Sequence, residues 1–419
     1  MNTQPHILFI SYDGLTDPLG QSQILPYLAG LAKSGYRFTV LSCEKPERFK
    51  KNQSYVESLI STYPITWVPI AYHKKPAVLS SIYDVWTMKK KSLVLFKEYK
   101  FDMVHTRAGL PALVGLWLKR KTGIKFLHDI REFYADGRID GGIWDIKKSY
   151  YRSIYKYFKK KEVEEIKNCD GIVCLTNAAE KIINSLPEYN AGIPLQVIPC
   201  SVDTNLFDPG KIKKDDQAAL KKKLGISPGE FVISYLGSLG SWYMINEMLQ
   251  LFKQIAEKIP ASKILFITPH HQEEITAVAT RNFIPEEQVI SVQARRHEVP
   301  IYLSLSNYSI FFIKPCYSKL SSSPTKHGEI MAMGIPLITN AGVGDVEQIV
   351  NDTSSGIILS EMNENEFESV ADKIFKSSEK IKSQAFDRLI VAGAKKYYSL
   401  NNAVEKYRQV YKTVLNHPS

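Results

Sequence analysis

Short apolar runs rich in β-branched residues alternate with helical segments along this chain, and that alternation limits its fold more than any other feature. The run HILFIS at 6–11 leads into a glycine-containing loop, a helical pattern over 24–33 and a second apolar run at 36–43. A strand, a helix and another strand in this order predict a parallel sheet with right-handed crossovers. Further runs of the same kind continue the series as far as Cys200.

The series begins again after the polar, lysine-rich stretch 210–223. There FVISYLG predicts a strand, 244–258 a helix, and KILFIT the next strand. We therefore predict two doubly wound α/β domains, with ligands bound at the carboxyl ends of the strands in the cleft between the domains. The predicted bounds are 1–204 for the first domain, 205–390 for the second, and 391–419 for a C-terminal helix that can return to the first domain.

The composition is that of a globular protein and excludes several other classes. With 44% hydrophobic and 23% charged residues over 419 positions, the chain is neither disordered nor collagen-like. Its five cysteines form no C-x-x-C pair, so we expect neither a disulfide framework nor a zinc site, and a reducing cytosol fits best. The N-terminal stretch has no basic region before its short apolar run, and no apolar stretch reaches about 18 residues, so neither a signal peptide nor a membrane-spanning helix is predicted.

The net charge of +11 lies almost wholly in the first half of the chain. Residues 1–200 carry a net charge of +10, whereas 201–419 carry +1. The segment 147–161, KKSYYRSIYKYFKKK, has seven basic residues and no acidic ones. Five of its apolar residues fall on one face of a helix and are Tyr150, Tyr151, Ile154, Tyr155 and Phe158. Such a helix suits an anionic membrane surface, although a packed helix with a solvated lysine face is the ordinary alternative. No nucleic-acid-binding signature accompanies the charge, so no nucleic acid partner is expected.

The segment 321–350 carries the sharpest motif of the chain. A loop of small polar residues leads into a helix that carries Lys326 and Glu329. The polar residues of this loop and of the helix start include Ser322, Ser323 and Thr325. Backbone N–H groups at such a helix start bind anions, and Lys326 adds a full positive charge. The Glu329 carboxylate suits the vicinal hydroxyls of a ribose, while a solvated helix face is the alternative for both charged residues.

This segment resembles the donor-site signature of the GT-B glycosyltransferases of family 4. The matching positions are Glu329, Met331, Ala332, Gly334, Pro336, Gly344 and Glu347. The first strand and glycine loop of the chain, and the run YLGSLGSWY, are similar to the corresponding parts of that family. The resemblance implies a GT-B fold, in which two Rossmann-like domains face each other across a cleft. It also implies a glycosyltransferase that retains anomeric configuration and needs no metal or other cofactor.

The resemblance implies roles for several donor-side residues. Glu329 would bind the donor ribose, and Lys326 with Arg296 would neutralise the diphosphate, where negative charge develops during glycosyl transfer. Gly20 and Gln21 would form the loop that approaches the donor phosphates and sugar. The remaining donor-binding positions are Gly237, Ser238, Ser322, Ser323 and Thr325.

Other candidates follow two predicted strands of the first half and would lie on the acceptor side. They are His105, Arg107, Asp129 and Arg131, together with Asp17 from the glycine loop. His128 resembles the active-site histidine of the family and joins Lys326 and Glu329 as a catalytic candidate, with His105 as its competitor. The ordinary alternatives are a core histidine in each case, a salt-bridged pair for Asp129 and Arg131, and turn capping for Asp17.

Two departures from the family pattern concern the donor site. The family often has a glutamate where this chain has Ser321, and its usual arginine and lysine after the first donor-domain strand are replaced here, with Ser238 after Gly237 and Trp242 and Tyr243 near the lysine position. A branch of the family with an S-x-P-x-K-x-x-E pattern would account for both departures.

The sequence therefore predicts transfer of a sugar from a UDP- or GDP-sugar to a lipid-linked or other glycan acceptor, in the synthesis of a cell-surface polysaccharide or glycoconjugate. The enzyme would be cytoplasmic and peripheral at the inner face of the membrane, which 147–161 would contact. A lipid-diphosphate acceptor would supply both the membrane and negative charge. The alternatives are a nucleotide-sugar epimerase, a phosphorylase-like enzyme, and a catalytically inactive GT-B partner protein.

Overall fold

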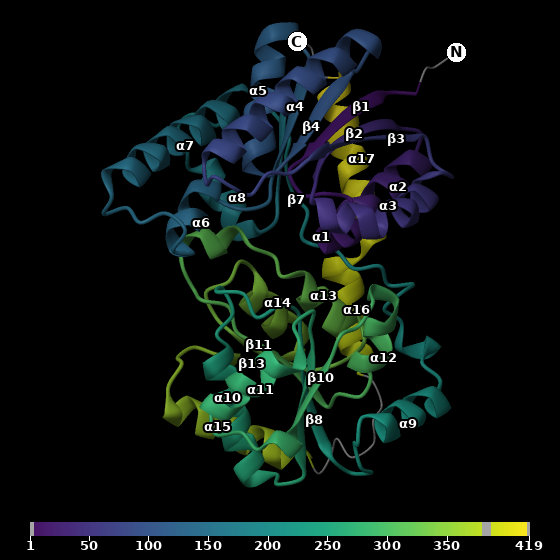
Figure 1. Cartoon of the computed structure of the whole chain (residues 1–419), viewed down its shortest axis with the longest axis vertical. Coiled ribbons are helices and arrows are strands. Elements are labelled where there is room, and N and C mark those ends of the chain that lie inside the picture. Colours follow the sequence, from purple (N-terminus) through teal and green to yellow (C-terminus); the bar gives the residue numbers. More distant parts are fainter. Residues whose placement is uncertain (1–3, 379–386, 417–419) are drawn as a thin grey trace. The chain divides into compact units, whose positions relative to one another are not determined.

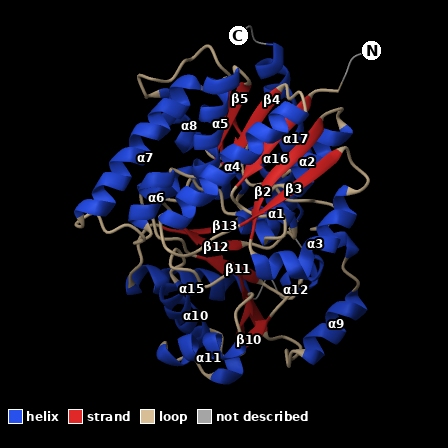
Figure 2. Cartoon of the chain, turned by 45° about the horizontal axis from the view of Figure 1, so that its top comes forward, coloured by secondary structure: helices blue, strands red, loops and turns tan. Residues whose placement is uncertain are grey.

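Two parallel sheets, each covered by helices on both faces, form two compact units (Figures 1 and 2). The computed structural model describes residues 4–378 and 387–416. Unit 1 consists of Met1–Ser201, Tyr317–Ser322 and Leu400–Ser419, and unit 2 consists of Val202–Cys316 and Ser323–Ser399. This architecture confirms the predicted doubly wound α/β fold class.

Within the described residues, the sheet of unit 1 has seven strands, all parallel. In spatial order they are β3 (Ile65–Ala71), β2 (Arg37–Glu44), β1 (His6–Ser11), β4 (Met103–Arg107), β5 (Lys125–Ile130), β6 (Gly171–Cys174) and β7 (Leu195–Val197). The strand order reverses beside β1, and the register there pairs Ser11 with Arg107, and Arg107 with Asp129. The carboxyl ends of β1, β4 and β5 therefore bring several of the predicted residues to one edge of the sheet.

Helices cover both faces of this sheet because its strands are apolar on both sides. Ile7 and Phe9 of β1 pack with α2, α3 and α17, whereas Leu8 and Ile10 pack with α4, α5 and α8. The helices of unit 1 are α1 (Pro18–Gln23), α2 (Leu25–Lys33), α3 (Pro46–Ile60), α4 (Leu79–Glu98), α5 (Gly109–Thr122), α6 (Tyr134–Asp140), α7 (Ser149–Asn168), α8 (Asn177–Asn184), α17 (Leu400–Asn416) and the 3-10 turn η4 (Tyr317–Ser321).

Six parallel strands form the sheet of unit 2 within the described residues. In spatial order they are β10 (Val289–Val292), β9 (Ser262–Ile267), β8 (Phe231–Leu236), β11 (Tyr308–Phe311), β12 (Leu337–Asn340) and β13 (Gly356–Leu359). The edge strand β10 was not predicted, because it has only four residues and is only partly buried, so its apolar run is too short to stand out in the sequence.

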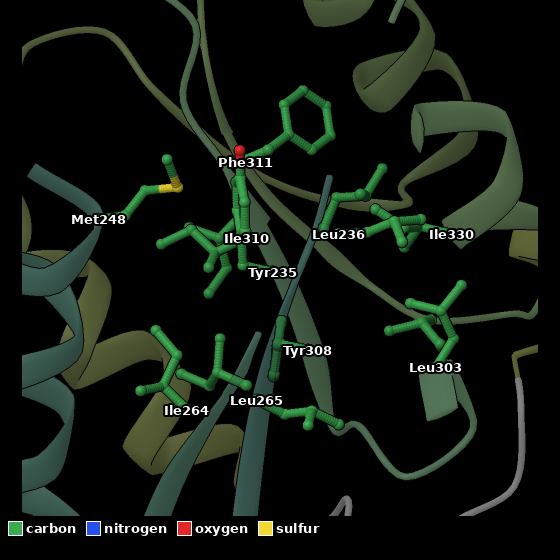
Figure 3. Close-up of a cluster of buried hydrophobic side chains, with 14 of the residues drawn as sticks. Tyr235, Leu236, Met248, Ile264, Leu265, Leu303, Tyr308, Ile310, Phe311 and Ile330 are labelled. Carbon is green, nitrogen blue, oxygen red and sulfur yellow. The ribbon is translucent and has the colours of Figure 1, made fainter. Parts of the chain in front are cut away.

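The helices of unit 2 include the one that carries Lys326 and Glu329. They are α9 (Lys214–Lys223), α10 (Ile245–Lys258), α11 (Gln272–Arg281), α12 (Val299–Leu303), α13 (Thr325–Ala332), α14 (Val346–Thr353), α15 (Glu364–Ser378) and α16 (Arg388–Tyr398), with 3-10 turns at Pro209–Lys211, Glu286–Gln288 and Arg296–Glu298. Ile330 packs into a core with Tyr235 and Phe311, which anchors α13 against β8 and β11 (Figure 3).

The division of the chain differs from the predicted bounds at three places, and one of them is Tyr317–Ser322, which was predicted in the second domain but belongs to unit 1. The first unit ends at Ser201 rather than at residue 204. The C-terminal helical pattern is two helices, since Ser399 leaves the helical conformation. α16 belongs to unit 2 because it packs on α13, whereas α17 belongs to unit 1, where it lies against α2 and β5 (Figure 1). Residues 379–386 of the predicted second domain lie outside the described residues.

Candidate functional site

Lys326 in the first turn of α13 is a buried ammonium surrounded by aromatic rings. Its side chain is 7% exposed, and Nζ lies 3.9 Å from the ring centroid of Tyr243 and 4.4 Å from that of Tyr235. The Tyr235 hydroxyl is 3.4 Å from Nζ, and no carboxylate lies within ion-pair distance among the described residues. Burial lowers the pKa of Lys326 to about 7, although the charge of Glu329 opposes this shift. An anion beside Nζ would stabilise the charged form, so this position suits an anionic ligand.

Glu329 lies one turn further along α13 and faces a second cation. Arg296 donates a hydrogen bond of 2.7 Å to Glu329 Oε1, and its guanidinium lies over the ring of Phe207. Only one carboxylate oxygen takes part in this bond, so the other keeps its capacity to accept from a hydroxyl. Lys326, Glu329 and Arg296 are therefore close together, but Arg296 pairs with Glu329, whereas the family resemblance implied a place for it with Lys326 at the diphosphate.

Gly237 brings backbone close to the Lys326 ammonium. Its φ of +124° is a conformation that side chains disfavour, and a Cβ atom built there would lie 2.8 Å from Lys326 Nζ. The carbonyl oxygen of the next residue, Ser238, accepts a hydrogen bond from the Tyr235 hydroxyl. Tyr243 was noted only as a departure from the family pattern, and Tyr235 was not singled out. No motif in the sequence distinguishes an aromatic strand residue that lines a site from one that packs in a core.

The polar segment before α13 divides between the two units. Ser321 is buried in unit 1, where its hydroxyl accepts from the backbone N–H of Phe133 at 2.9 Å and donates to the carbonyl of Ser318 at 2.8 Å. Ser321, at the position where the family often has a glutamate, therefore has a structural role. Ser322 ends the unit 1 segment, whereas Ser323 and Thr325 belong to unit 2.

The glycine loop of unit 1 is held by a buried carboxylate. Glu44 at the end of β2 accepts from the backbone N–H of Leu15 at 2.7 Å and of Thr16 at 3.1 Å. Gly20 packs so tightly that a Cβ atom would lie 2.1 Å from the carbonyl oxygen of Gly14. Gln21 reaches the carbonyl of Thr16 at 3.3 Å. The sequence located this loop but not Glu44, because its partner atoms are backbone groups 28 and 29 residues away.

Two predicted acceptor-side residues form ion pairs at this edge. Arg107 at the end of β4 binds Asp13 at the end of β1. Asp17 instead binds Lys45 at 2.6 Å and Arg48 at 2.7 Å. Asp17 is the residue before α1, yet its side chain makes no capping hydrogen bond, so ion pairs take the place of the turn capping that was the alternative role for Asp17. The two acids therefore hold the glycine loop to different neighbours.

His105 belongs to a buried network with the C-terminal helix. Its Nδ1 lies 2.6 Å from the Tyr411 hydroxyl, and its Nε2 lies 3.5 Å from Asp129. Tyr407 donates to Asp129 at 2.8 Å, and Arg131 binds the other oxygen of Asp129 at 3.4 Å. This geometry supports the structural alternative for all three predicted residues of the network. Local sequence could not reveal Tyr407 and Tyr411, which lie more than 270 residues from their partners.

His128 lies on the other face of the same sheet. Its Nε2 is 3.8 Å from Glu165 of α7, and both side chains are buried. Burial lowers the pKa of His128 to about 4 and raises the pKa of Glu165 well above its usual value. His128 is therefore neutral at pH 7, and its catalytic role stays a prediction.

The aromatic stripe of α7 is mostly packed inside unit 1. Its residues Tyr151, Ile154, Tyr155 and Phe158 pack against a cluster that contains Tyr134 and Trp144, while Tyr150 is 54% exposed. The lysines of α7 remain at the surface, so the structure matches the packed-helix alternative better than an aromatic membrane face.

Residues 4–378 and 387–416 contain neither a cluster of metal-binding side chains nor a helix that could span a membrane. No group of three His, Cys, Asp or Glu side chains there is placed to hold a metal ion. None of the helices in these ranges is both long enough and apolar enough to cross a bilayer. The absence of a cofactor stays a prediction.

Comparisons with known proteins cover both units. The family model described as Glycosyltransferase Family 4 matches residues 24–206, and the model described as Glycosyl transferases group 1 matches residues 216–387. An alpha-monoglucosyldiacylglycerol synthase from Streptococcus pneumoniae is 22% identical over 64% of this chain and 58% of its own length. A UDP-Gal:alpha-D-GlcNAc-diphosphoundecaprenol alpha-1,3-galactosyltransferase from Escherichia coli is 30% identical over 36% of each chain. The chain thus spans less than two thirds of the length of these relatives.

A solved structure extends the similarity to nearly the whole chain. The Anabaena protein HepE, in complex with UDP-glucose, matches with a TM-score of 0.67 and 14% identity, covering 98% of this chain and 99% of its own. At this identity the match concerns the fold alone.

Proposed function

Since the chain belongs to family 4 of the glycosyltransferases and has the GT-B fold, we propose that it transfers a sugar from a nucleotide-sugar donor to a lipid-linked or other glycan acceptor. The donor is a UDP- or GDP-sugar, the anomeric configuration is retained, and the product belongs to a cell-surface polysaccharide or glycoconjugate. The observation that carries this proposal is the grouping of Lys326, Glu329 and Arg296 beside the backbone of Gly237.

In the proposed reaction, Lys326 binds the donor diphosphate. Its ammonium has aromatic faces and one hydroxyl around it, so a phosphate oxygen would supply the anionic partner that a buried cation requires. As the bond from the sugar to the nucleotide breaks, negative charge grows on the leaving phosphate. A cation already in place stabilises that charge without reorganisation.

Glu329 and Arg296 would hold the rest of the nucleotide. The Glu329 carboxylate accepts hydrogen bonds from the ribose hydroxyls, and Arg296 orients it. Gly237 allows phosphate to approach the ammonium where any larger residue would intrude. Ser238, Ser323 and Thr325 offer further polar groups on the same unit.

The names of two relatives support a lipid-linked acceptor. One relative is a synthase of a glucosyldiacylglycerol and another acts on a diphosphoundecaprenol-linked sugar. A lipid-diphosphate or other lipid-linked acceptor at the inner membrane face would suit the positive charge of the first half of the chain.

A thermal-shift screen with UDP-, GDP-, ADP- and CMP-sugars tests the donor proposal. A donor present well above its Kd should raise the Tm of the wild type but not that of Glu329→Ala. The transfer reaction is then tested with the donor so identified and lipid-diphosphate or short glycan acceptors. Release of the nucleotide only when acceptor is present supports transfer, whereas acceptor-independent release would favour an epimerase. No stabilisation by any nucleotide sugar would overturn the proposal.

A further inference from the structure

The helix α4 (Leu79–Glu98) exposes large apolar side chains in its first turns and has polar side chains among the residues that it buries. The residues that it buries are Ser80, Asp84, Met88, Ser92 and Leu95. Its outward side carries Leu79, Ile82, Tyr83 and Trp86, which are exposed by 63%, 60%, 52% and 49%. We call these four residues the α4 face. A surface helix of a globular protein normally shows the reverse pattern, so the α4 face requires an explanation outside the fold.

The inward carboxylate of Asp84 is satisfied within unit 1, so this orientation of α4 is stable. Asp84 is fully buried and accepts from the Tyr12 hydroxyl at 2.8 Å and from the backbone N–H of His73 at 3.1 Å. The His73 ring also lies 2.6 Å from Asp84. These bonds fix the rotation of α4 about its axis. The helix cannot turn the α4 face inward without leaving a carboxylate unpartnered.

The charges around the α4 face are mostly positive. Between His73 and Glu98 the sequence has six lysines and two acids, which are the buried Asp84 and Glu98 at the C-terminal end of α4. Lys74 and Lys75 are exposed just before the helix, and Lys90 lies over the Trp86 ring, 3.6 Å from its centroid. An apolar patch with a lysine border matches the layers of an anionic bilayer, in which charged headgroups surround an apolar interior.

The lysines of α7 extend this surface. The charge of Lys161 adds to burial in lowering the pKa of Lys89, so α4 and α7 bring like charges together. Val85 of α4 packs in the same cluster as the inward stripe of α7. Lys161 also pairs with Glu164 of α7 at 2.8 Å, which offsets part of this repulsion, and anionic lipid would relieve the remainder.

We propose that the α4 face inserts into the interfacial layer of an anionic lipid bilayer, with the lysines of α4 and α7 bound to headgroups. The apolar contact therefore comes from α4 and not from the aromatic stripe of 147–161, which is packed. This inference rests on the proposed function for its purpose, because a lipid-linked acceptor lies in a membrane. Trp and Tyr are the side chains that favour this layer, and Ile82 and Leu79 add apolar area.

Vesicle co-sedimentation with matched variants tests the proposal. The test variant is Ile82→Ser/Trp86→Ser. The control is Phe283→Ser/Leu389→Ser. It removes two apolar side chains from unit 2 that are 81% and 74% exposed, which is more than the two side chains removed in the test variant. We expect the wild type and the control to bind phosphatidylcholine vesicles that contain phosphatidylglycerol, and the test variant to bind at least about tenfold more weakly. High salt and pure phosphatidylcholine should weaken wild-type binding.

Two results would overturn the proposal. One is binding of the test variant equal to that of the control. The other is a concentration-dependent dimer of the wild type that the test variant abolishes and vesicles do not compete for, because the α4 face would then bind a second copy. Thermal stabilisation by a nucleotide sugar is measured on the same variants. Loss of vesicle binding with donor binding intact isolates the membrane role, and absence of donor binding in the wild type counts against the proposed function alone.

Discussion

Each unit buries a cation beside the carboxyl ends of its strands, and the two cations have opposite surroundings. Arg131 in unit 1 has Asp129 as its partner; although burial opposes the charge, this carboxylate raises the pKa of Arg131 well above its usual value. Lys326 in unit 2 faces aromatic rings, and burial lowers its pKa to about 7. A buried cation with a carboxylate partner is complete within the fold, whereas one without such a partner is poised for an anionic ligand.

The largest expected effect is on activity and comes from unit 2. Lys326→Ala and Glu329→Ala should each lower the rate of sugar transfer about 100- to 1,000-fold, because a preorganised charge is lost at the leaving group or its nucleotide is no longer held. Initial rates with a saturating acceptor measure this effect. The exposed Lys373→Ala and Glu368→Ala serve as controls and should retain wild-type rates. Full activity in both site variants would remove the donor-site assignment.

Unit 1 should respond to the equivalent change by losing stability. Asp129→Ala leaves Arg131 buried without its carboxylate partner, and it also removes the partner of His105 and of Tyr407. The free energy of unfolding should therefore fall by about 3–5 kcal/mol. Urea denaturation followed by circular dichroism measures this.

Lys326→Met is the matched contrast for this measurement. It replaces a buried, unpaired ammonium with an apolar side chain of similar length and should leave stability unchanged or raised. Equal destabilisation by Asp129→Ala and Lys326→Met would erase the distinction between the two cations.

Gly237→Ala should sharpen the comparison by altering only the approach to Lys326. The φ of Gly237 is +124°, and a Cβ atom there would lie 2.8 Å from Lys326 Nζ. We therefore expect a cost of about 1–3 kcal/mol, divided between the free energy of unfolding and the free energy of nucleotide binding. Calorimetric Kd values and the Tm separate the two contributions. Gly225→Ala, at a positive φ with no atom within 4 Å, is the control for backbone strain alone. If both variants weaken nucleotide binding equally, the close approach to the ammonium has no role.

The smallest expected effect is the pH dependence of nucleotide binding. The unliganded pKa of Lys326 is about 7, and a bound diphosphate raises it. The resulting gain in affinity is fully present below pH 7 and is lost as pH rises through the higher pKa of the complex, by at most about tenfold per pH unit. Titrations between pH 6 and 9 measure the slope. Lys326→Met should lose this component, so an unchanged slope in that variant would assign the titration to another group.

The local spacing of residues was enough to predict a good part of the molecule. The predicted strands at 6–11, 36–43, 231–237 and 263–268 match β1, β2, β8 and β9 within one residue at each end, because each is a continuous apolar run between turn signals. The helix carrying Lys326 and Glu329 was predicted from a loop and a helix pattern that are contiguous in sequence. The grouping with Arg296 was predicted from family resemblance and not from spacing.

Other features depend on partners far apart in the chain. The C-terminal helix at 391–419 was predicted as one element, yet packing of α16 on α13 and of α17 on α2 divides it at Ser399. The stripe of 147–161 was predicted from its helical period, but that period is the same whether the apolar face meets lipid or a core. α4 went unnoticed because an exposed apolar face is recognisable only when the buried side is known.

The sequence by itself determined the alternation of strands and helices, the excess of positive charge in the first half, and the order of residues around α13. These depend on neighbours in the chain, and short-range patterns record them. Tertiary structure alone decided that Tyr235 and Tyr243 surround Lys326, that Tyr407 and Tyr411 complete the His105 network, and that α4 faces outward. The physical reason is that desolvation and pairing depend on which distant groups the fold brings within a few ångströms, and no local pattern encodes that distance.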